Sequence, residues 1–269
     1  MPRSQRWSQL RSPELGERLA DPGTVVLVPL GAIEQHGAHL PVDVDVHLAA
    51  AVCEAVAERA PGVLLAPAVP WGFSTSHEPF SGTISLQPDT LVAVLRDVLR
   101  CVVDNGCRTT IVVNGHNGNI GPAAQVVAEM GADGDAFVGL VNYFDLTLEV
   151  FRARRRTEIG GEGHAGELET SLELHLRPER VGGERAARYV EPVARRGFAD
   201  LTQRGALIQG FNLARDYPEG VMGDPRPATA ELGGELFAAA AEGLTEIVTD
   251  LAARAAQRPS TSMQGKDGR

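Results

Sequence analysis

The sequence has few cysteines, no long apolar run and no excess of positive charge, and each absence excludes a class of protein. Only three of its 269 residues are cysteines, and none form a CxxC pair, which indicates free thiols rather than a disulfide framework. No apolar run approaches the roughly 18 to 20 residues that span a bilayer. The charged first residues also lack the apolar core of a secretion signal. We therefore expect a cytoplasmic protein.

The charge balance narrows the range of partners. Thirty-five acidic residues against 25 basic ones give a formal net charge of −10. A field of that sign repels phosphate backbones and anionic lipids, so we expect binding to neither nucleic acid nor membranes.

The hydrophobic pattern alternates between short β-branched runs and longer helical stripes. Strands are predicted over 24–30, 62–69, 108–114 and 135–143, and helices over 45–60, 91–104, from 120 to about 130, 166–176 and 227–256. This alternation predicts an α/β fold, a single layered domain over residues 1–257 whose mostly parallel central sheet is flanked by helices. Residues 177–226 lack clean periodicity, and we expect surface structure there that helps to form a pocket or a subunit contact. Residues 258–269 are expected to form a disordered tail.

Four segments hold most of the histidines together with many acidic residues: 34–45, 76–83, 114–119 and 162–171. The first and third directly follow predicted strands, and loops at the carboxyl ends of parallel strands converge on one crevice. Imidazole and carboxylate together form the ligand set of zinc, manganese and iron. Alone, a histidine in a glycine-rich loop is more often a hydrogen-bonding residue, and Asp43 and Asp45 could simply cap the next helix. Because four segments share the same chemistry, we favour a metal centre.

These segments resemble the motifs of the creatininase (creatinine amidohydrolase) family. The similar stretches are PLGAIEQHGAHLPVDVD at 29–45, VVNGHNGN at 112–119 and HAGELETS at 164–171. The resemblance extends from about residue 24 to 250. It implies a single α/β domain, two adjacent divalent metal ions per chain, hydrolysis of amide-type C–N bonds, and a homo-oligomer that is a hexamer built from dimers.

The resemblance also implies roles for individual residues. Glu34 and His116 would hold one metal and His36 the other, with Asp45 bridging the two. His164 stands at the position of the family's catalytic histidine, where we expect a proton shuttle to the leaving nitrogen. The alternative for His164 is a simple hydrogen bond at the entry of a helix.

One position of the second motif departs from creatininase itself. Creatininase completes its second metal site with a glutamate two residues after the motif histidine, where this chain has Gly118. We therefore expect Glu169 to complete the site, with Glu167 as the second choice. The residues expected to contact substrate or to support the ligands are His39, His77, Asn117 and Glu167.

The leading hypothesis is a dinuclear metal amidohydrolase acting on a small cyclic amide or a formamide, and on C–N bonds other than ordinary peptide bonds. Zinc is the favoured metal, with manganese and iron as alternatives; such ions lower the pKa of water from about 15.7 to about 7 and so supply a hydroxide nucleophile. Two tryptophans that flank creatinine in creatininase correspond to Phe144 and Gly160 here, so creatinine itself is not the expected substrate. Two alternatives stay open: a family peptidase that trims a short peptide in cofactor maturation, and a non-catalytic metal-binding scaffold.

Overall fold

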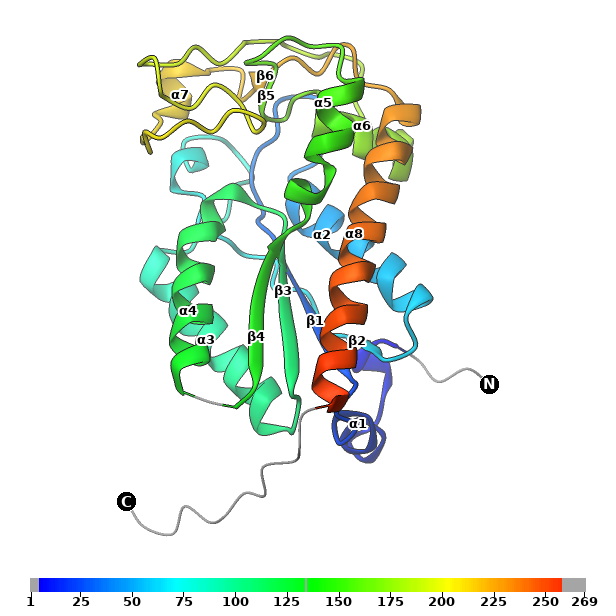
Figure 1. The fold of residues 1–269 in the computed structure, drawn as a ribbon. Coiled ribbons are helices and arrows are strands. Elements are labelled where there is room, and N and C mark those ends of the chain that lie inside the picture. The colour runs from blue at the N-terminus through cyan, green and yellow to red at the C-terminus, as the bar shows by residue number, and fades with distance from the viewer. Residues whose placement is uncertain (1–4, 134, 258–269) are drawn as a thin grey trace.

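A sheet of four parallel strands forms the centre of the computed structural model, which describes residues 5–133 and 135–257 (Figure 1). In spatial order the strands are β2 (Val63–Leu65), β1 (Val25–Leu30), β3 (Thr109–Asn114) and β4 (Phe137–Asn142). All three pairings within this sheet are parallel. The predicted α/β class is confirmed.

Strand β1 shows why the sheet lies between two layers of helices. All of its residues are buried. Val25 and Leu27 point into one hydrophobic cluster, and Val26 and Val28 point into the other. A strand that is apolar on both faces is typical of a parallel sheet covered on both sides.

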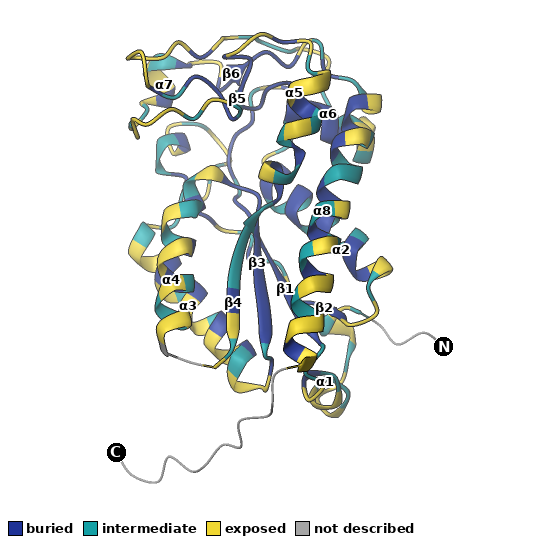
Figure 2. Ribbon diagram, viewed as in Figure 1, coloured by how far each residue is buried: buried dark blue, intermediate teal, exposed yellow. Residues whose placement is uncertain are grey.

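Helices α2 (Val44–Arg59) and α8 (Ala230–Gln257) cover one face of the sheet, and α3 (Pro88–Asp104) and α4 (Ile120–Asp133) cover the other (Figure 1). In α3 a proline lies in the first turn, where it is tolerated, and leucines at helical spacing are buried against the sheet. Figure 2 shows buried residues on the inner sides of the helices and exposed residues on their outer sides. Within 5–133 and 135–257, no helix has the length and apolar character needed to cross a membrane.

The remaining elements lie mostly beyond the carboxyl ends of the strands (Figure 1). They are α5 (Leu148–Arg154), β5 (Glu162–His164), α6 (Glu167–Leu176), α7 (Leu213–Asp216) and β6 (Met222–Gly223), while α1 (Ser12–Leu19) packs at the other end of the sheet. Strands β5 and β6 form a second, antiparallel sheet. Short 3-10 turns occur at Trp7–Gln9, Thr75–His77, Asn117–Asn119, Tyr143–Thr147 and Pro178–Arg180.

The structure differs from the sequence-based prediction in several elements. The strand predicted over 62–69 is only three residues long, because the chain then diverges from the sheet and returns to it at one isolated bridge between Leu30 and Val69. Sheet β5–β6 and helices α1 and α5 were not predicted. Two- and three-residue strands carry no recognisable pattern, and the helices are only eight and seven residues long. The irregular character predicted for 177–226 is confirmed apart from short elements. The predicted tail at 258–269 lies outside the described residues.

The register between β1 and β3 brings two loops together. Val25 pairs with Thr109 and Leu30 with Asn114, so both strands end at the same level and the loops after them start side by side. The first residue after β3, Gly115, lies directly against the start of α2. A Cβ at this position would be 2.2 Å from the Asp45 carbonyl oxygen. Only glycine allows this approach without moving α2.

We expect Gly115→Ala to lower the free energy of unfolding by about 1–3 kcal/mol, the usual cost of overpacking. The matched control is Gly121→Ala in α4, where a Cβ would meet nothing within 4 Å and no loss is expected. Urea unfolding of both variants measures the difference. Equal stability of the two variants would contradict the close approach.

Candidate metal centre

Histidines and carboxylates from four separate elements meet above the carboxyl ends of β1 and β3. They come from the loop after β1, the first turn of α2, the loop after β3, and the β5–α6 segment. Each side chain is at most 13% exposed: Glu34, His36, Asp45, His116, His164 and Glu169. The structure therefore brings together residues up to 135 positions apart in the sequence, from Glu34 to Glu169.

Two overlapping sets of side chains have the geometry of metal sites. Ligand atoms of Glu34, Asp45 and His116 lie within 4.8 Å of one another, and so do those of His36, Asp45 and Glu169. Asp45 belongs to both sets. A further set within the same limit joins His164 to Glu34 and His36.

Four of the atoms in these sets have no hydrogen-bond partner in the described part of the protein. Across the described residues, both carboxylate oxygens of Glu34, Asp45 Oδ2 and His36 Nε2 are buried without a hydrogen bond. A buried polar group left unsatisfied costs about 1–3 kcal/mol, and more if it is charged. Unpaired oxygens and an imidazole nitrogen that point toward one another fit a divalent cation.

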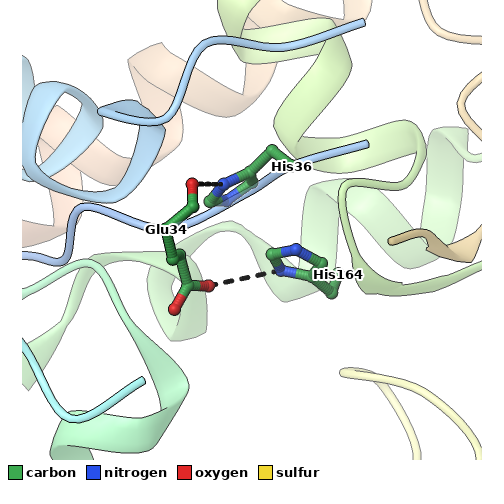
Figure 3. A group of neighbouring side chains, drawn as sticks. All are labelled: Glu34, His36 and His164. Atoms are coloured by element: carbon green, nitrogen blue, oxygen red, sulfur yellow. Dashed lines mark hydrogen bonds and ion pairs between the residues drawn. The ribbon is translucent and has the colours of Figure 1, made fainter. Parts of the chain in front are cut away.

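The ring orientations of two histidines fit the same role. His36 Nδ1 donates a hydrogen bond to the Glu34 carbonyl at 3.1 Å (Figure 3), which leaves Nε2 3.3 Å from Asp45 Oδ1. His116 Nε2 donates to the Phe73 carbonyl at 3.0 Å, which leaves Nδ1 3.2 Å from Asp45 Oδ2. A metal-binding histidine commonly donates its other ring N–H to a carbonyl, which holds the ring in position.

The electrostatics of the cluster favour cations. Burial raises the pKa of Glu34 and of Glu169, and the neighbouring Asp45 raises both further. Burial also disfavours the charge on Asp45, but His36 and His116 outweigh it and lower its pKa. Although burial lowers the pKa of an imidazole, the carboxylates raise that of His36 to about 10 and that of His116 to about 9. The carboxylates thus favour positive charge among them, which bound divalent cations would supply in place of the protons on the two histidines.

The two glutamates of the third motif have different surroundings. Glu169 Oε2 accepts a hydrogen bond from the Ala165 amide at 2.6 Å, and Oε1 lies 3.9 Å from His36 Nε2. Glu167 instead accepts hydrogen bonds from the Arg156 amide and from the amide and hydroxyl of Thr157, at 2.6–2.9 Å. Glu169 faces the cluster, and Glu167 holds the turn before β5.

Gly118 has no side chain to offer as a ligand, and the structure leaves no space for one at this position. A Cβ there would lie 2.3 Å from the Phe73 carbonyl oxygen and 2.5 Å from His116 Nε2. The carbonyl that orients His116 thus occupies the direction in which a side chain at 118 would point.

His164 lies next to Glu34 with one nitrogen directed toward it (Figure 3). Its Nε2 donates to the Gln35 carbonyl at 2.8 Å, and its Nδ1 lies 3.5 Å from Glu34 Oε1. Burial lowers the pKa of His164 well below its usual value, and the nearby His36 and His77 lower it further. The ring is therefore neutral at neutral pH, with an acceptor nitrogen facing the centre.

Gln35 was not predicted as a site residue, although it lies inside the first motif. Its side-chain amide is 3.1 Å from His77 Nδ1 and donates to the Gly220 carbonyl at 3.0 Å. His77 Nε2 lies 3.5 Å from Glu34 Oε1, and burial lowers the pKa of His77 to about 3. Gln35 thus connects the centre to the segment that precedes β6.

The other predicted site residues lie outside the two ligand sets. His39 Nε2 is 3.0 Å from the Thr170 hydroxyl and connects the first loop to α6. Asn117 is exposed. Two buried asparagines of the same motif were missed: Asn114 donates to the His116 carbonyl at 2.7 Å, and Asn119 donates to the Gly31 carbonyl at 3.0 Å. Their position in the second motif was the available signal.

Comparison with known proteins identifies the family. The model of the creatininase family, described as creatinine amidohydrolase, matches residues 8–248. The chain belongs to the creatininase family. The mycofactocin precursor peptide peptidase of Mycobacterium ulcerans is 34% identical over 266 residues, 92% of this chain and 93% of that protein. The creatinine amidohydrolase of Pseudomonas putida is 33% identical over 188 residues, 64% of this chain and 72% of that protein.

Solved creatininase structures have the same fold. The one described as "Creatininase Mn" has a TM-score of 0.78 at 26% identity and covers 92% of this chain and 98% of its own. A variant described as of Zn-Zn type has a TM-score of 0.77 at the same identity and coverage. This chain is a creatininase-family hydrolase that acts on C–N bonds, and its candidate ligands lie within the matched region.

We expect Glu169→Gln to weaken divalent-metal binding by at least about 10-fold, because it removes a charged candidate ligand. Glu167→Gln should instead lose about 1–3 kcal/mol of stability through its buried hydrogen bonds and keep its metal affinity. Calorimetric titration with Zn²⁺ and urea unfolding of both variants separate the two effects. If Glu167→Gln alone weakens metal binding, the assignment is wrong.

Proposed function

We propose that this protein is a metal-dependent peptidase that hydrolyses an amide bond in a short peptide. The observation that carries the proposal is the 34% identity to a mycofactocin precursor peptide peptidase across 92% of this chain. The similarity to a creatinine amidohydrolase covers only 64% of the chain. The peptidase alternative is thus better supported than a small cyclic amide or formamide, and the restriction to bonds other than peptide bonds is not supported.

Two divalent ions, zinc or manganese, fit the residues of the centre. Glu34, Asp45 and His116 would hold one, and His36, Asp45 and Glu169 the other, with Asp45 shared. When bound, such ions lower the pKa of water to about 7 and polarise the carbonyl of the substrate. The three carboxylates would offset most of the positive charge of the pair, as a desolvated site requires.

His164 is the proposed proton carrier. Its Nε2–H is held by the Gln35 carbonyl, so Nδ1 is the nitrogen that exchanges a proton on the side of Glu34. Because the ring is neutral, it accepts a proton as the nucleophile forms and then donates it to the leaving nitrogen of the peptide bond. His77 and Gln35 hold Glu34 and His164 in this arrangement.

Neither residue at the positions of the flanking tryptophans offers a flat face to a small ring. Phe144 is 4% exposed and packs in the main core, with the Arg204 guanidinium 5.5 Å from its centroid. Gly160 has a φ of +95°, and a Cβ there would lie 2.7 Å from the Val190 carbonyl oxygen. These two positions therefore do not supply the aromatic contacts that would select creatinine, each worth about 0.5–1.5 kcal/mol.

The substrate class is tested by a panel of three compounds with the Zn²⁺- or Mn²⁺-loaded protein: a mycofactocin precursor peptide, creatinine and an N-formyl amine. We expect the peptide to be cleaved, and the other two to react at least about 10-fold more slowly in kcat/KM, as loss of two aromatic contacts implies. Mass spectrometry detects the peptide products. A protein that prefers creatinine or the formyl compound would contradict the proposal, and one that binds metal but cleaves nothing would support the scaffold alternative.

For the proton carrier, we expect His164→Asn to lower kcat for the peptide by about 10²–10⁴-fold, the usual contribution of a general acid–base group. Its metal content, measured by elemental analysis, should equal that of the parent protein. Loss of metal from this variant would show that His164 is a ligand instead.

A further inference from the structure

A second polar cluster lies one helical turn away from the candidate metal centre. On α6, Glu173 follows Glu169 by four residues, so these two side chains share one face of the helix. Arg177 is the residue immediately after the helix. Asp43, the residue before α2, and His47 in its first turn lie two residues on either side of Asp45. We name Asp43, His47, Glu173 and Arg177 the α2–α6 clamp.

Hydrogen bonds run continuously through the clamp. His47 Nδ1 donates to Glu173 Oε1 at 2.9 Å. Arg177 donates to both oxygens of Glu173 and, through its two terminal nitrogens, to both oxygens of Asp43, all at 2.9 Å. A two-pronged guanidinium contact fixes the direction as well as the distance between its partners.

Because Glu173 is buried, its charge depends on these hydrogen bonds for compensation. Its side chain is 0% exposed, while His47, Arg177 and Asp43 are 24%, 19% and 42% exposed. Burial disfavours its charge, but the hydrogen bonds from His47 and Arg177 outweigh this effect and lower its pKa. Removing one partner of a buried charge is costly, so the clamp holds the two helices at one separation.

That separation sets the distance between two candidate metal ligands. Asp45 on α2 and Glu169 on α6 both face His36 Nε2, at 3.3 and 3.9 Å. Two carboxylates that converge on one point repel each other until a cation lies between them. A rigid connection one turn away opposes that repulsion.

We propose that the α2–α6 clamp positions Asp45 and Glu169 for the ion that they share with His36. This inference rests on the metal centre of the proposed function. The clamp residues are positioning residues, because none of them belongs to the ligand sets. Loss of a clamp contact should chiefly lower the affinity for the ion held by His36, Asp45 and Glu169, called here the second ion, since Glu169 belongs only to that set.

The experiment is calorimetric titration of the metal-free full-length protein with Zn²⁺ for the parent, Arg177→Met, Arg177→Lys and Asp43→Asn. We expect Arg177→Met to lower the affinity for the second ion by about 10-fold or more, as the loss of a residue that supports a metal ligand does. The affinity for the first ion should change much less. The affinity of Arg177→Lys for the second ion should lie between those of the parent and Arg177→Met, because lysine keeps the positive charge but cannot make the two-pronged contact. Asp43→Asn removes the charge of a half-exposed side chain, so it should disturb folding less. It tests the same contact if the arginine variants fold poorly.

The matched control is Arg96→Met, which breaks an Arg–Glu contact between α3 and α4, from Arg96 to Glu129 at 2.6 Å. Thermal unfolding of every variant separates lost stability from lost affinity. The inference is overturned if the clamp variants bind both ions with the affinity of the parent, or if they lose affinity for both ions equally. It is also overturned if Arg96→Met lowers the affinity for the second ion as much as the clamp variants do. A parent protein that does not bind two ions would overturn the proposed centre and this inference with it.

Discussion

The burial of the Asp45 carboxylate between two histidines is the constraint on which the rest of the site depends. Asp45 lies 3.3 Å from His36 and 3.2 Å from His116, and it is 2% exposed. A buried charge is costly unless other groups compensate it. The position of Asp45 in the first turn of α2 helps, because the amino terminus of a helix favours negative charge. The two histidines come from the loops after β1 and β3, so the in-register pairing of these strands is what places them on either side of α2.

The site also depends on backbone that has no space for larger side chains. Gly115 allows β3 to end against α2, and the Phe73 carbonyl that holds His116 fills the space beside Gly118. In creatininase itself the second metal site is completed from the position of Gly118; in the proposed centre Glu169 of α6 takes that role. Such an exchange would keep the number of carboxylates in the centre while one of them comes from α6. A buried ionic network is found where α6 packs against α2, one turn from Glu169.

Residues 177–226 form surface structure that contacts the candidate metal centre. Strand β6 pairs with β5 next to His164, and the Gly220 carbonyl accepts a hydrogen bond from Gln35. The sequence pattern predicted surface structure that helps to form a pocket or a subunit contact, and the structure shows the segment in contact with the site at Gln35. The pairing itself was not predictable, because two- and three-residue strands have no periodicity and their partners are far apart in the chain. Variation in this segment can alter access to the site without changing its ligands, as expected of loops on a rigid scaffold.

The sequence by itself determined the four parallel strands, the helices between them and the residue types of the centre. These features follow from local periodicity and from motifs in which the ligands lie within a few residues of one another. Only the tertiary structure showed that Glu169 faces the cluster and Glu167 does not. Both lie in the first turn of α6, two residues apart, so they point in different directions, and what each one meets depends on distant segments. The same holds for the contacts of His47 and Arg177, whose partners on the other helix are 126 and 134 residues away. A contact across that separation leaves no local pattern, because it is created by the packing of two helices against one sheet.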